Sequence, residues 1–549
     1  MTTSTPMAAG ETTIAKHLVR RFRELGIDEA FGIVGDFALR LFGRIADEHF
    51  PIHVTADEQG AAFAADAYAR MRGFGVCAIT YGVGGLKVVN ATAGAWAEQV
   101  PLLILSGAPG LVERQGDPLL HHRVKNFETQ MNVFQDLTIA QAALANPLTA
   151  ASEIDRVIEA ILLHQRPGYI EVPRDLIDKP IVSPTAPLQR IAQSADPDRL
   201  KAAVDAVIDA MAQARNIVAV AGLQATRRGD VDDIKALVEH LSIPFATGIL
   251  SKGAISERHP LALGVYMGAV SLEPVVRMVE DADLILAFGV LYSDITMGGF
   301  TAKLRRERIV ECRDNEVNVG LMTFQNVPLH AFLPALVEAA AARLPSNIVN
   351  PVETQPQFTP KPNQPLTVDS VMACVSAWLD ERHSVAIDPG ECLFASVELN
   401  VPSLTLASAY YATMGYAVPA ALGMGRADRN KRPVVLVGDG AFMMTGLEAQ
   451  SAIFHDVKAI IIVLDNNGYG TQRPMLDGPF NNIARLKAEE LPKAFGRGHG
   501  FLCTTEDELD HAMAQAVAGD DLYLIRACVP QGQISGALKR LTDALKARV

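Results

Sequence analysis

The sequence lacks a long apolar run. No stretch comes near the ~18 uninterrupted apolar residues that a membrane span needs. Residues 1–13 lack both the basic region and the apolar region of a secretory signal peptide. We therefore expect an intracellular, cytoplasmic protein without a membrane partner.

Cysteine and positive charge are also scarce. The six cysteines stand singly, without any Cys-x-x-Cys spacing, and are predicted to be small buried apolar residues rather than crosslinks. Lys and Arg total 49 against 62 Asp and Glu, which gives a net charge of −13. Because a phosphate backbone attracts proteins of the opposite charge, this balance argues against nucleic acid as a partner.

What the sequence does have is apolar content spread over a great length. Its 549 residues, 49% of them hydrophobic, suffice for about three domains with separate cores, at ~100–200 residues per domain. Strand-like and helix-like patterns alternate throughout, which predicts an α/β fold with three doubly wound parallel-sheet domains. The predicted domains are 1–185, 186–344 and 367–549. The residues between the last two, 345–366, contain six prolines and are predicted to form a linker.

The periodicities also place individual elements. Helices are expected from Thr13 to Gly26, at 58–72, 86–97 and 332–343, from near Thr445, and from about Ile534. Strands are expected at 30–34, 76–80, 102–106, 217–220, 244–247, 284–288, 309–311, 384–387, 404–406, 433–437, 459–464 and 522–525.

Two of the expected strands end in polar residues. One runs into Gly438-Asp439-Gly440 and the other into Asp465-Asn466-Asn467-Gly468. Either group alone is typical of a turn. Because the carboxyl ends of parallel strands meet at one edge of a sheet, we expect Asp439 and Asn466 to converge there. The amides that follow Gly440 suit a phosphate group. A carboxylate, an amide oxygen and the Gly468 carbonyl are the oxygen ligands that magnesium prefers.

This pair of motifs resembles the signature of thiamine-diphosphate-dependent enzymes, and the resemblance extends over essentially the whole chain. It is strongest to the 2-oxo acid decarboxylases of the phenylpyruvate and indolepyruvate type. The resemblance implies, in order, a pyrimidine-binding domain, a middle Rossmann-like domain and a diphosphate-binding domain. It implies Mg²⁺ held by Asp439, Asn466 and Gly468. It also implies that the following residues bind thiamine diphosphate: Glu58, Gly390, Ala412, Met414, Gly438, Asp439, Gly440, Ala441, Asn466, Gly468 and Tyr469.

The resemblance also assigns roles around the cofactor's pyrimidine. Glu58, at the start of an alanine-rich helix, resembles the family's activating glutamate, and its position predicts a buried carboxyl group. An acid at a helix start is otherwise explained by the helix dipole alone. Met414 resembles the apolar wedge between the cofactor's rings, and the Ala412 carbonyl resembles the acceptor for the pyrimidine amine.

Three further residues resemble the decarboxylases' acid groups. Gly35-Asp36-Phe37 is similar to the aspartate loop, and His121-His122 is similar to the paired-histidine motif. Gln472 stands where many pyruvate decarboxylases carry a glutamate. Glutamine forms hydrogen bonds but relays no proton, so we expect proton handling to fall on Asp36, His121 and His122, with Gln472 contacting the substrate.

The resemblance implies decarboxylation of a 2-oxo acid to an aldehyde and carbon dioxide. Leu393, Phe394 and Thr471 are expected to line the substrate pocket, with room for a side chain larger than methyl. A homodimer or dimer of dimers with active sites at the subunit interface is implied as well.

Two other enzyme classes compete with decarboxylation. A thiamine-dependent carboligase of the acetolactate-synthase kind would share Glu58 and the metal motif but would not need the histidine pair. A nucleotide-cofactor oxidoreductase would need residues 82–87 to serve as Gly-x-Gly-x-x-Gly, and Lys87 occupies the place of the third glycine.

Overall fold

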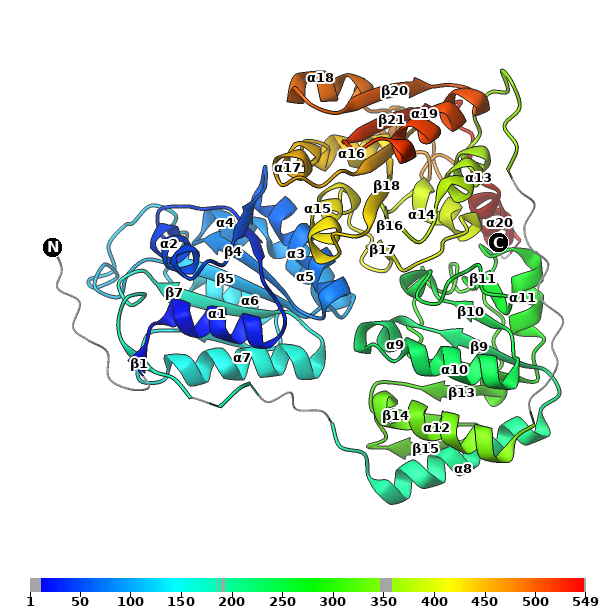
Figure 1. The fold of residues 1–549 in the computed structure, drawn as a ribbon, viewed down its shortest axis with the longest axis horizontal. Coiled ribbons are helices and arrows are strands. Elements are labelled where there is room, and N and C mark those ends of the chain that lie inside the picture. The colour runs from blue at the N-terminus through cyan, green and yellow to red at the C-terminus, as the bar shows by residue number, and fades with distance from the viewer. Residues whose placement is uncertain (1–10, 185, 189–192, 346–357, 548–549) are drawn as a thin grey trace. The chain divides into compact units, whose positions relative to one another are not determined.

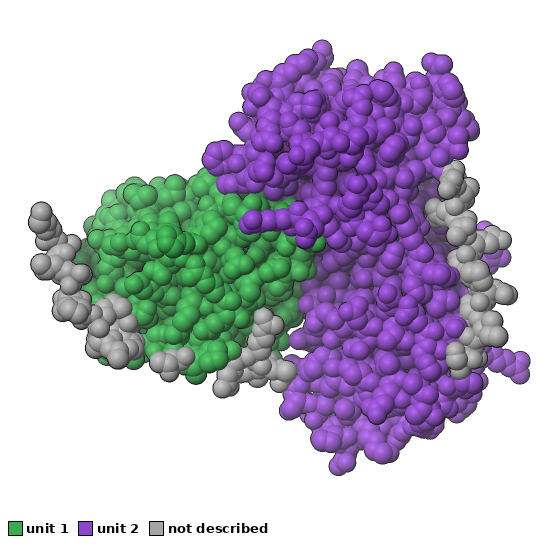
Figure 2. Space-filling view, viewed as in Figure 1, with its two compact units in different colours: residues 1–192, 422–428 green, residues 193–421, 429–549 purple. Residues whose placement is uncertain are grey.

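A computed structural model describes residues 11–184, 186–188, 193–345 and 358–547 (Figure 1). Residues 1–10 and most of the predicted linker lie outside the described residues. The chain forms two compact units, which Figure 2 distinguishes by colour. Unit 1 comprises Met1–Ala192 with Leu422–Asp428, and unit 2 comprises Gln193–Ala421 with Arg429–Val549. The three predicted domain boundaries stay predictions.

Unit 1 is built on a parallel sheet with the strand order β3-β2-β4-β5-β7-β6. The strands of this unit are β1 (Glu11–Thr12), β2 (Ala30–Gly32), β3 (Ile52–Val54), β4 (Gly75–Thr80), β5 (Leu102–Ala108), β6 (Gln141–Ala143), β7 (Gly168–Pro173) and β8 (Ile181–Val182). Its helices are α1 (Ile14–Glu24), α2 (Leu39–Asp47), α3 (Glu58–Arg72), α4 (Val83–Lys87), α5 (Val89–Ala97), α6 (Thr129–Gln135) and α7 (Ala150–His164). Every residue of β4, β5 and β7 is buried, as expected of a sheet covered on both faces.

Helix α3 has the bounds that the sequence predicts. The Asp57 side chain caps its start by accepting hydrogen bonds from the amides of Gln59 (2.7 Å) and Gly60 (3.1 Å). Gly73 ends it in the left-handed conformation, with φ of 82°. These two signals place Glu58 in the first turn. The single helix predicted at 86–97 is instead the pair α4 and α5.

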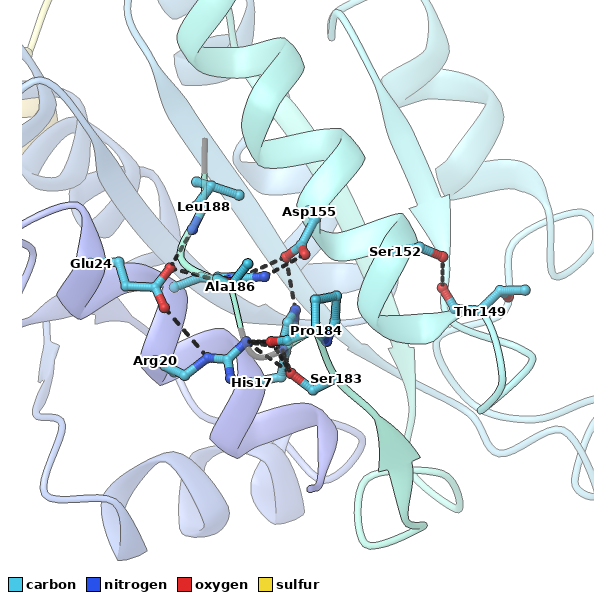
Figure 3. A network of polar contacts seen from close by, with 11 residues as sticks. His17, Arg20, Glu24, Thr149, Ser152, Asp155, Ser183, Pro184, Ala186 and Leu188 are labelled. Carbon is cyan, nitrogen blue, oxygen red and sulfur yellow. Dashed lines mark hydrogen bonds and ion pairs between the residues drawn. The ribbon is translucent and has the colours of Figure 1, made fainter. Parts of the chain in front are cut away.

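A polar network fixes the segment that follows β8 onto α1 and α7 (Figure 3). The His17 ring lies 2.8 Å from Asp155 on one side and 2.8 Å from Ser183 on the other. Arg21 binds both carboxylate oxygens of Asp155, at 2.8 and 2.7 Å. Glu24 accepts a hydrogen bond from the Leu188 amide at 2.8 Å.

Unit 2 contains two sheets. The first has the order β11-β10-β9-β12-β13-β14-β15 and comprises β9 (Ile217–Ala221), β10 (Phe245–Thr247), β11 (Ala262–Val265), β12 (Leu284–Phe288), β13 (Ile309–Cys312), β14 (Glu316–Val319) and β15 (Met322–Gln325). The helices along this stretch are α8 (Pro197–Gln213), α9 (Leu223–Arg228), α10 (Val231–Leu241), α11 (Glu273–Glu280) and α12 (Leu329–Arg343). The prediction of a purely parallel sheet was wrong here, because β14 pairs antiparallel with both β13 and β15. Gly320, with a φ of 58°, lies in the turn between β14 and β15.

The second sheet of unit 2 is parallel, with the order β17-β16-β18-β19-β21-β20. Its strands are β16 (His383–Ile387), β17 (Thr405–Ala407), β18 (Arg432–Gly438), β19 (Ile460–Asp465), β20 (His499–Cys503) and β21 (Tyr523–Cys528). The helices here are α13 (Val368–Trp378), α14 (Glu391–Ala395), α16 (Asp439–Thr445), α17 (Glu448–Phe454), α18 (Leu491–Phe495), α19 (Glu506–Ala518) and α20 (Gly536–Lys546). Helix α15 (Ala417–Ala427) begins in unit 2, and its residues from Leu422 onward are counted with unit 1. Three α/β sheets confirm the predicted fold class.

The cysteines and the apolar segments have the properties that the sequence predicts. All six cysteines are free, five of them buried and Cys528 half-buried. Among the described residues, we find no helix with the length and apolar character that crossing a membrane requires.

Candidate active site

The two polar strand ends of unit 2 lie side by side. Strands β18 and β19 are parallel neighbours, with Gly438 opposite Leu464, so Asp439 and Asn466 emerge at the same edge. The Asp439 carboxylate accepts a hydrogen bond from the Gly468 amide at 2.9 Å. A side chain at Gly440 would lie 2.7 Å from the Tyr469 ring, which explains why glycine is needed there. The structure therefore brings the predicted metal ligands together.

The helix predicted near Thr445 begins earlier than expected. Helix α16 starts at Asp439, directly after β18, and Thr445 is its last residue. Gly440 lies inside its first turn beneath Tyr469 rather than in a separate turn. Ala441 is the next residue of this helix and is buried.

The polar atoms at this edge fit a magnesium ion. The Oδ1 atom of Asn466 is buried and has no hydrogen-bond partner among the described residues. Burial and the neighbouring carboxylate of Asp465 raise the pKa of Asp439 well above its ordinary value. Two adjacent carboxylates and an unpartnered amide oxygen form a site that a cation would stabilise, with the oxygen ligands that Mg²⁺ prefers.

Asp465 also holds the loop that follows β19. One of its oxygens accepts a hydrogen bond from the Asn467 amide at 3.1 Å. The other is bound by the Arg526 guanidinium at 2.7 Å. Asn467 has a φ of 64°, a left-handed conformation that asparagine tolerates better than most residues. This ion pair fixes the chain on either side of Asn466 and Gly468.

The segment with Met414 is held by a buried carboxylate that sequence analysis missed. Asp388, fully buried after β16, accepts hydrogen bonds from the amides of Gly415 and Ala417, each at 2.8 Å. Burial raises its pKa to about 7, although the two amides act in the opposite direction. The Thr445 hydroxyl donates to the Gly415 carbonyl at 2.8 Å. The segment with Met414 is therefore attached to the end of α16, the helix that begins at the predicted metal ligand Asp439.

Ala412 and Gly390 lie in unusual backbone conformations. Ala412 has a φ of 59°, a left-handed conformation that costs alanine energy and that concentrates at functional sites. Gly390 has a φ of 107°, which excludes most other residues. Its neighbour Glu391 is 5% exposed and accepts a hydrogen bond from the Ser535 amide at 2.6 Å. Glu391 thus anchors the start of α20.

In unit 1, Glu58 forms an ion pair that the sequence did not reveal. Its carboxylate lies 3.3 Å from the Lys87 ammonium, which is 2.6 Å from Asp57. The Glu58 side chain is 15% exposed in the single chain, so it is partly buried, whereas the sequence predicts a buried carboxyl group. Gly84 lies beside it, where a Cβ would be 3.5 Å from Oε1. Residues 82–87, which an oxidoreductase would need as its glycine-rich nucleotide motif, therefore pack against the predicted active-site residue Glu58.

The predicted acid groups of unit 1 form one cluster. Oxygen and nitrogen atoms of Asp36, His121 and His122 all lie within 4.8 Å of one another. His121 Nε2 is 2.8 Å from Asp36 Oδ2. Phe37 stacks on the His121 ring with centroids 4.7 Å apart. A residue larger than Gly82 would collide with His122, whose φ is 66°.

Hydrogen bonds among buried polar residues support the loop that contains His121 and His122. The Gln130 side chain accepts a hydrogen bond from the Gly82 amide at 2.6 Å and donates to the Tyr169 hydroxyl at 2.6 Å. The Tyr81 hydroxyl donates to the Phe127 carbonyl at 2.9 Å. These contacts hold Gly82, which packs against the His122 backbone, and Phe127, which follows His122 in the chain.

The remaining predicted site residues lie in unit 2. Gln472 is exposed, and its backbone amide binds the Tyr469 carbonyl at 3.1 Å. Leu393 is 2% exposed within the apolar core, and Phe394 packs against the same core. Their predicted roles with the substrate stay predictions.

Three parts of the chain match the domains of a known family. They match the thiamine pyrophosphate enzyme N-terminal TPP binding domain at residues 12–140, the central domain at 204–339 and the C-terminal TPP binding domain at 390–527. Thiamine pyrophosphate and thiamine diphosphate are names for the same cofactor. The chain therefore belongs to the thiamine pyrophosphate enzyme family and has its thiamine diphosphate binding domains.

Full-length relatives narrow the class. Over 545 residues the chain is 31% identical to an indole-3-pyruvate decarboxylase from Azospirillum brasilense, covering 97% of this chain and 98% of the relative. Over 549 residues it is 32% identical to an alpha-keto-acid decarboxylase from Mycobacterium leprae, covering 96% and 95%. The protein is thus a thiamine-diphosphate-dependent enzyme related to the 2-oxo acid decarboxylases.

Proposed function

We propose that this protein catalyses the non-oxidative decarboxylation of a 2-oxo acid to an aldehyde and carbon dioxide, with thiamine diphosphate and Mg²⁺. The observation that carries this proposal is the cluster of Asp36, His121 and His122. A family member that only ligates carbon fragments needs the metal motif and Glu58, but has no need for a dyad of histidines joined to a carboxylate.

The residues of unit 2 hold the cofactor. Asp439, Asn466 and the Gly468 carbonyl bind Mg²⁺, and the amides at the start of α16, with Gly438, Gly440 and Ala441, face the diphosphate. Asp388 fixes the loop from which Met414 and the Ala412 carbonyl contact the cofactor's rings. Gly390 and Tyr469 complete the contacts.

The residues of unit 1 handle protons. Thiamine diphosphate, when bound, supplies a carbon that accepts the electrons released as carbon dioxide leaves. Glu58 binds the pyrimidine ring nitrogen and holds the proton there. His121 and His122 would supply the proton that the aldehyde carbon needs, and Asp36 would orient the His121 ring through its 2.8 Å contact.

The substrate is a small 2-oxo acid with a side chain larger than methyl. Gln472 donates a hydrogen bond to its carboxylate but exchanges no proton with it. The Azospirillum relative is an indole-3-pyruvate decarboxylase, which favours arylpyruvates as substrates. The mycobacterial relative is an alpha-keto-acid decarboxylase, a broader name that aliphatic 2-oxo acids also fit. The active assembly is a homodimer or a dimer of dimers in the cytoplasm.

The direct test is aldehyde detection with purified protein, Mg²⁺ and thiamine diphosphate across phenylpyruvate, indolepyruvate, pyruvate and branched aliphatic 2-oxo acids. Aldehyde and carbon dioxide in equal amounts are expected from at least one of them. A carboligation assay runs beside it. If a ligated hydroxyketone forms without free aldehyde, the protein is a carboligase and not a decarboxylase. If no 2-oxo acid gives a cofactor-dependent product, both proposed activities are overturned.

A further inference from the structure

The cluster of Asp36, His121 and His122 has the composition of a transition-metal site. Two imidazoles and one carboxylate form a ligand set that divalent transition metals bind, with positions left open for water or another ligand. Among the described residues, no other group of three or more His, Cys, Asp or Glu side chains comes as close together. Magnesium does not compete well for such ligands, because it prefers oxygen.

The distances within the cluster suit one ion. Ligands at ~2.0–2.2 Å from zinc lie at most about 4.4 Å from each other. The three ligand atoms here are within 4.8 Å of one another, and the closest pair, His121 Nε2 and Asp36 Oδ2, is 2.8 Å apart. The His121 side chain is 59% exposed, which leaves its ring room for the shift of a few tenths of an ångström that one ion would require.

Packing keeps the ligands near these positions before any ion arrives. The His121 ring stacks on Phe37 at an interplanar angle of 16°, and the His122 ring meets the edge of Phe37 with centroids 5.7 Å apart. His122 Nδ1 is buried without a hydrogen-bond partner among the described residues. Such preorganisation reduces the ordering that metal binding would otherwise require.

The positive charge of Arg174 opposes a cation at this cluster, but a carboxylate balances that charge. The Arg174 guanidinium lies 3.7 Å from Asp36 Oδ2. It is engaged by the Glu113 carboxylate, to which its Nε donates at 2.8 Å. The neighbouring charge is therefore compensated by Glu113. Arg174 and His121 face the same oxygen of Asp36, Oδ2, and His121 lies closer to it, at 2.8 Å.

We propose that Asp36, His121 and His122 bind one Zn²⁺ ion per chain, and that the ion blocks the proposed reaction by occupying the groups that carry its protons. The binding claim rests on the cluster's geometry alone, and the inhibition claim rests on the proposed decarboxylase function. Zinc acts at a place separate from Mg²⁺, which Asp439, Asn466 and Gly468 are proposed to hold.

The test is a titration of the holoenzyme, saturated with Mg²⁺ and thiamine diphosphate, with zinc against a chromophoric chelator. Wild-type protein should bind one zinc per chain in competition with the chelator. His121→Gln and His122→Asn should each weaken binding by about tenfold or more. His164→Gln, at an exposed histidine at the end of α7, is the matched control and should bind as wild type does. Far-ultraviolet circular dichroism confirms that each variant is folded.

The outcomes separate the two claims. No zinc bound, or zinc bound equally by the cluster variants, as at the half-buried Cys528 thiol, would overturn the metal site. Replacing zinc with Co²⁺ should give visible absorption that is lost in His121→Gln, and its persistence there would also overturn the site. Variant-sensitive zinc binding that leaves aldehyde formation unchanged would keep the site and remove the cluster from the proposed reaction.

Discussion

At the scale of single residues, the proposed chemistry depends on carboxylates whose partners come from elsewhere in the chain. Glu58 is the clearest case. Its position at a helix start follows from the sequence, but its contact with Lys87 does not, because an ion pair between two elements leaves no local pattern. Asp388 is different. It follows β16 as Asp439 follows β18, so the rule that polar residues at parallel strand ends face a ligand could have found it.

Replacing Glu58 by glutamine should separate cofactor binding from catalysis. The amide retains the size of the side chain but cannot hold the proton at the pyrimidine. We expect thiamine diphosphate to bind with nearly unchanged affinity while aldehyde formation falls by about a hundredfold or more. Isothermal titration and an aldehyde assay measure the two quantities. Glu48→Gln, at a partly exposed glutamate of the same unit, is the control. Near-normal turnover in Glu58→Gln would remove Glu58 from its role.

Replacing Asp388 by asparagine should loosen the loop with Met414. Asparagine has one acceptor oxygen, so either the Gly415 or the Ala417 amide loses its partner in a fully buried place. Leaving a buried amide unpartnered costs ~1–3 kcal/mol, and we expect cofactor affinity to fall about tenfold. Titration with thiamine diphosphate measures it, against Asp543→Asn at an exposed position. Unchanged affinity would show that the loop does not depend on Asp388.

At the scale of elements, helices and strands with strong local signals appear where the sequence predicts them. Helix α3 has a capping aspartate, an alanine-rich interior and a terminal glycine, and its predicted bounds are confirmed. Helix α16 begins at Asp439 instead of near Thr445 because a glycine that signals a turn is used for close packing under Tyr469. The β14–β15 hairpin was missed because helix–strand alternation, read as parallel pairing, does not anticipate an antiparallel edge.

The polar network between α1 and α7 should make the stability of unit 1 depend on pH. Burial opposes ionisation of Asp155, but His17 and Arg21 outweigh it and lower its pKa to about 2. A carboxylate with a lowered pKa stabilises the fold above its unfolded pKa of about 4, and this contribution is lost as pH falls toward 2. Asp155→Asn should therefore cost about 2 kcal/mol at pH 7. The deficit relative to wild type should shrink below pH 4.

Urea unfolding followed by Trp96 fluorescence measures this effect in unit 1. A Trp378→Phe background removes the only other tryptophan of the sequence. Asp47→Asn, at an aspartate whose side chain is 60% exposed, is the control and should change stability little. A deficit for Asp155→Asn that is the same at pH 7 and pH 3 would contradict the assigned pKa.

At the scale of the whole molecule, the family and the fold class could be predicted from the sequence, since they follow from two strand-end motifs and a long alternation of elements. The mixed middle sheet and the polar supports beneath the active site could not, because they depend on contacts between distant segments. The oligomeric state also cannot be predicted from local sequence patterns. We expect the predicted homodimer to pack through apolar side chains that are exposed in the single chain on α16, on α17 and between them: Met443, Met444, Leu447 and Phe454.

A charge in that apolar surface should disrupt the assembly. Leu447 is 61% exposed, so Leu447→Glu leaves the fold of the chain intact while placing a carboxylate in the predicted interface. Light scattering after size exclusion should show a shift from dimer or tetramer to monomer, with loss of aldehyde formation. Leu321→Glu, at a fully exposed leucine elsewhere in unit 2, should change neither. A wild-type monomer with full activity at micromolar concentration would refute the predicted assembly.

The most direct test of the central claim measures aldehyde formed per bound thiamine diphosphate in wild type and in the double variant His121→Gln/His122→Asn. The claim is that the histidine cluster makes this thiamine enzyme a decarboxylase. We predict unchanged cofactor occupancy and a fall in aldehyde formation of about a hundredfold or more, because no other groups are assigned to deliver the proton. A double variant that forms aldehyde from a 2-oxo acid at the wild-type rate would contradict the claim.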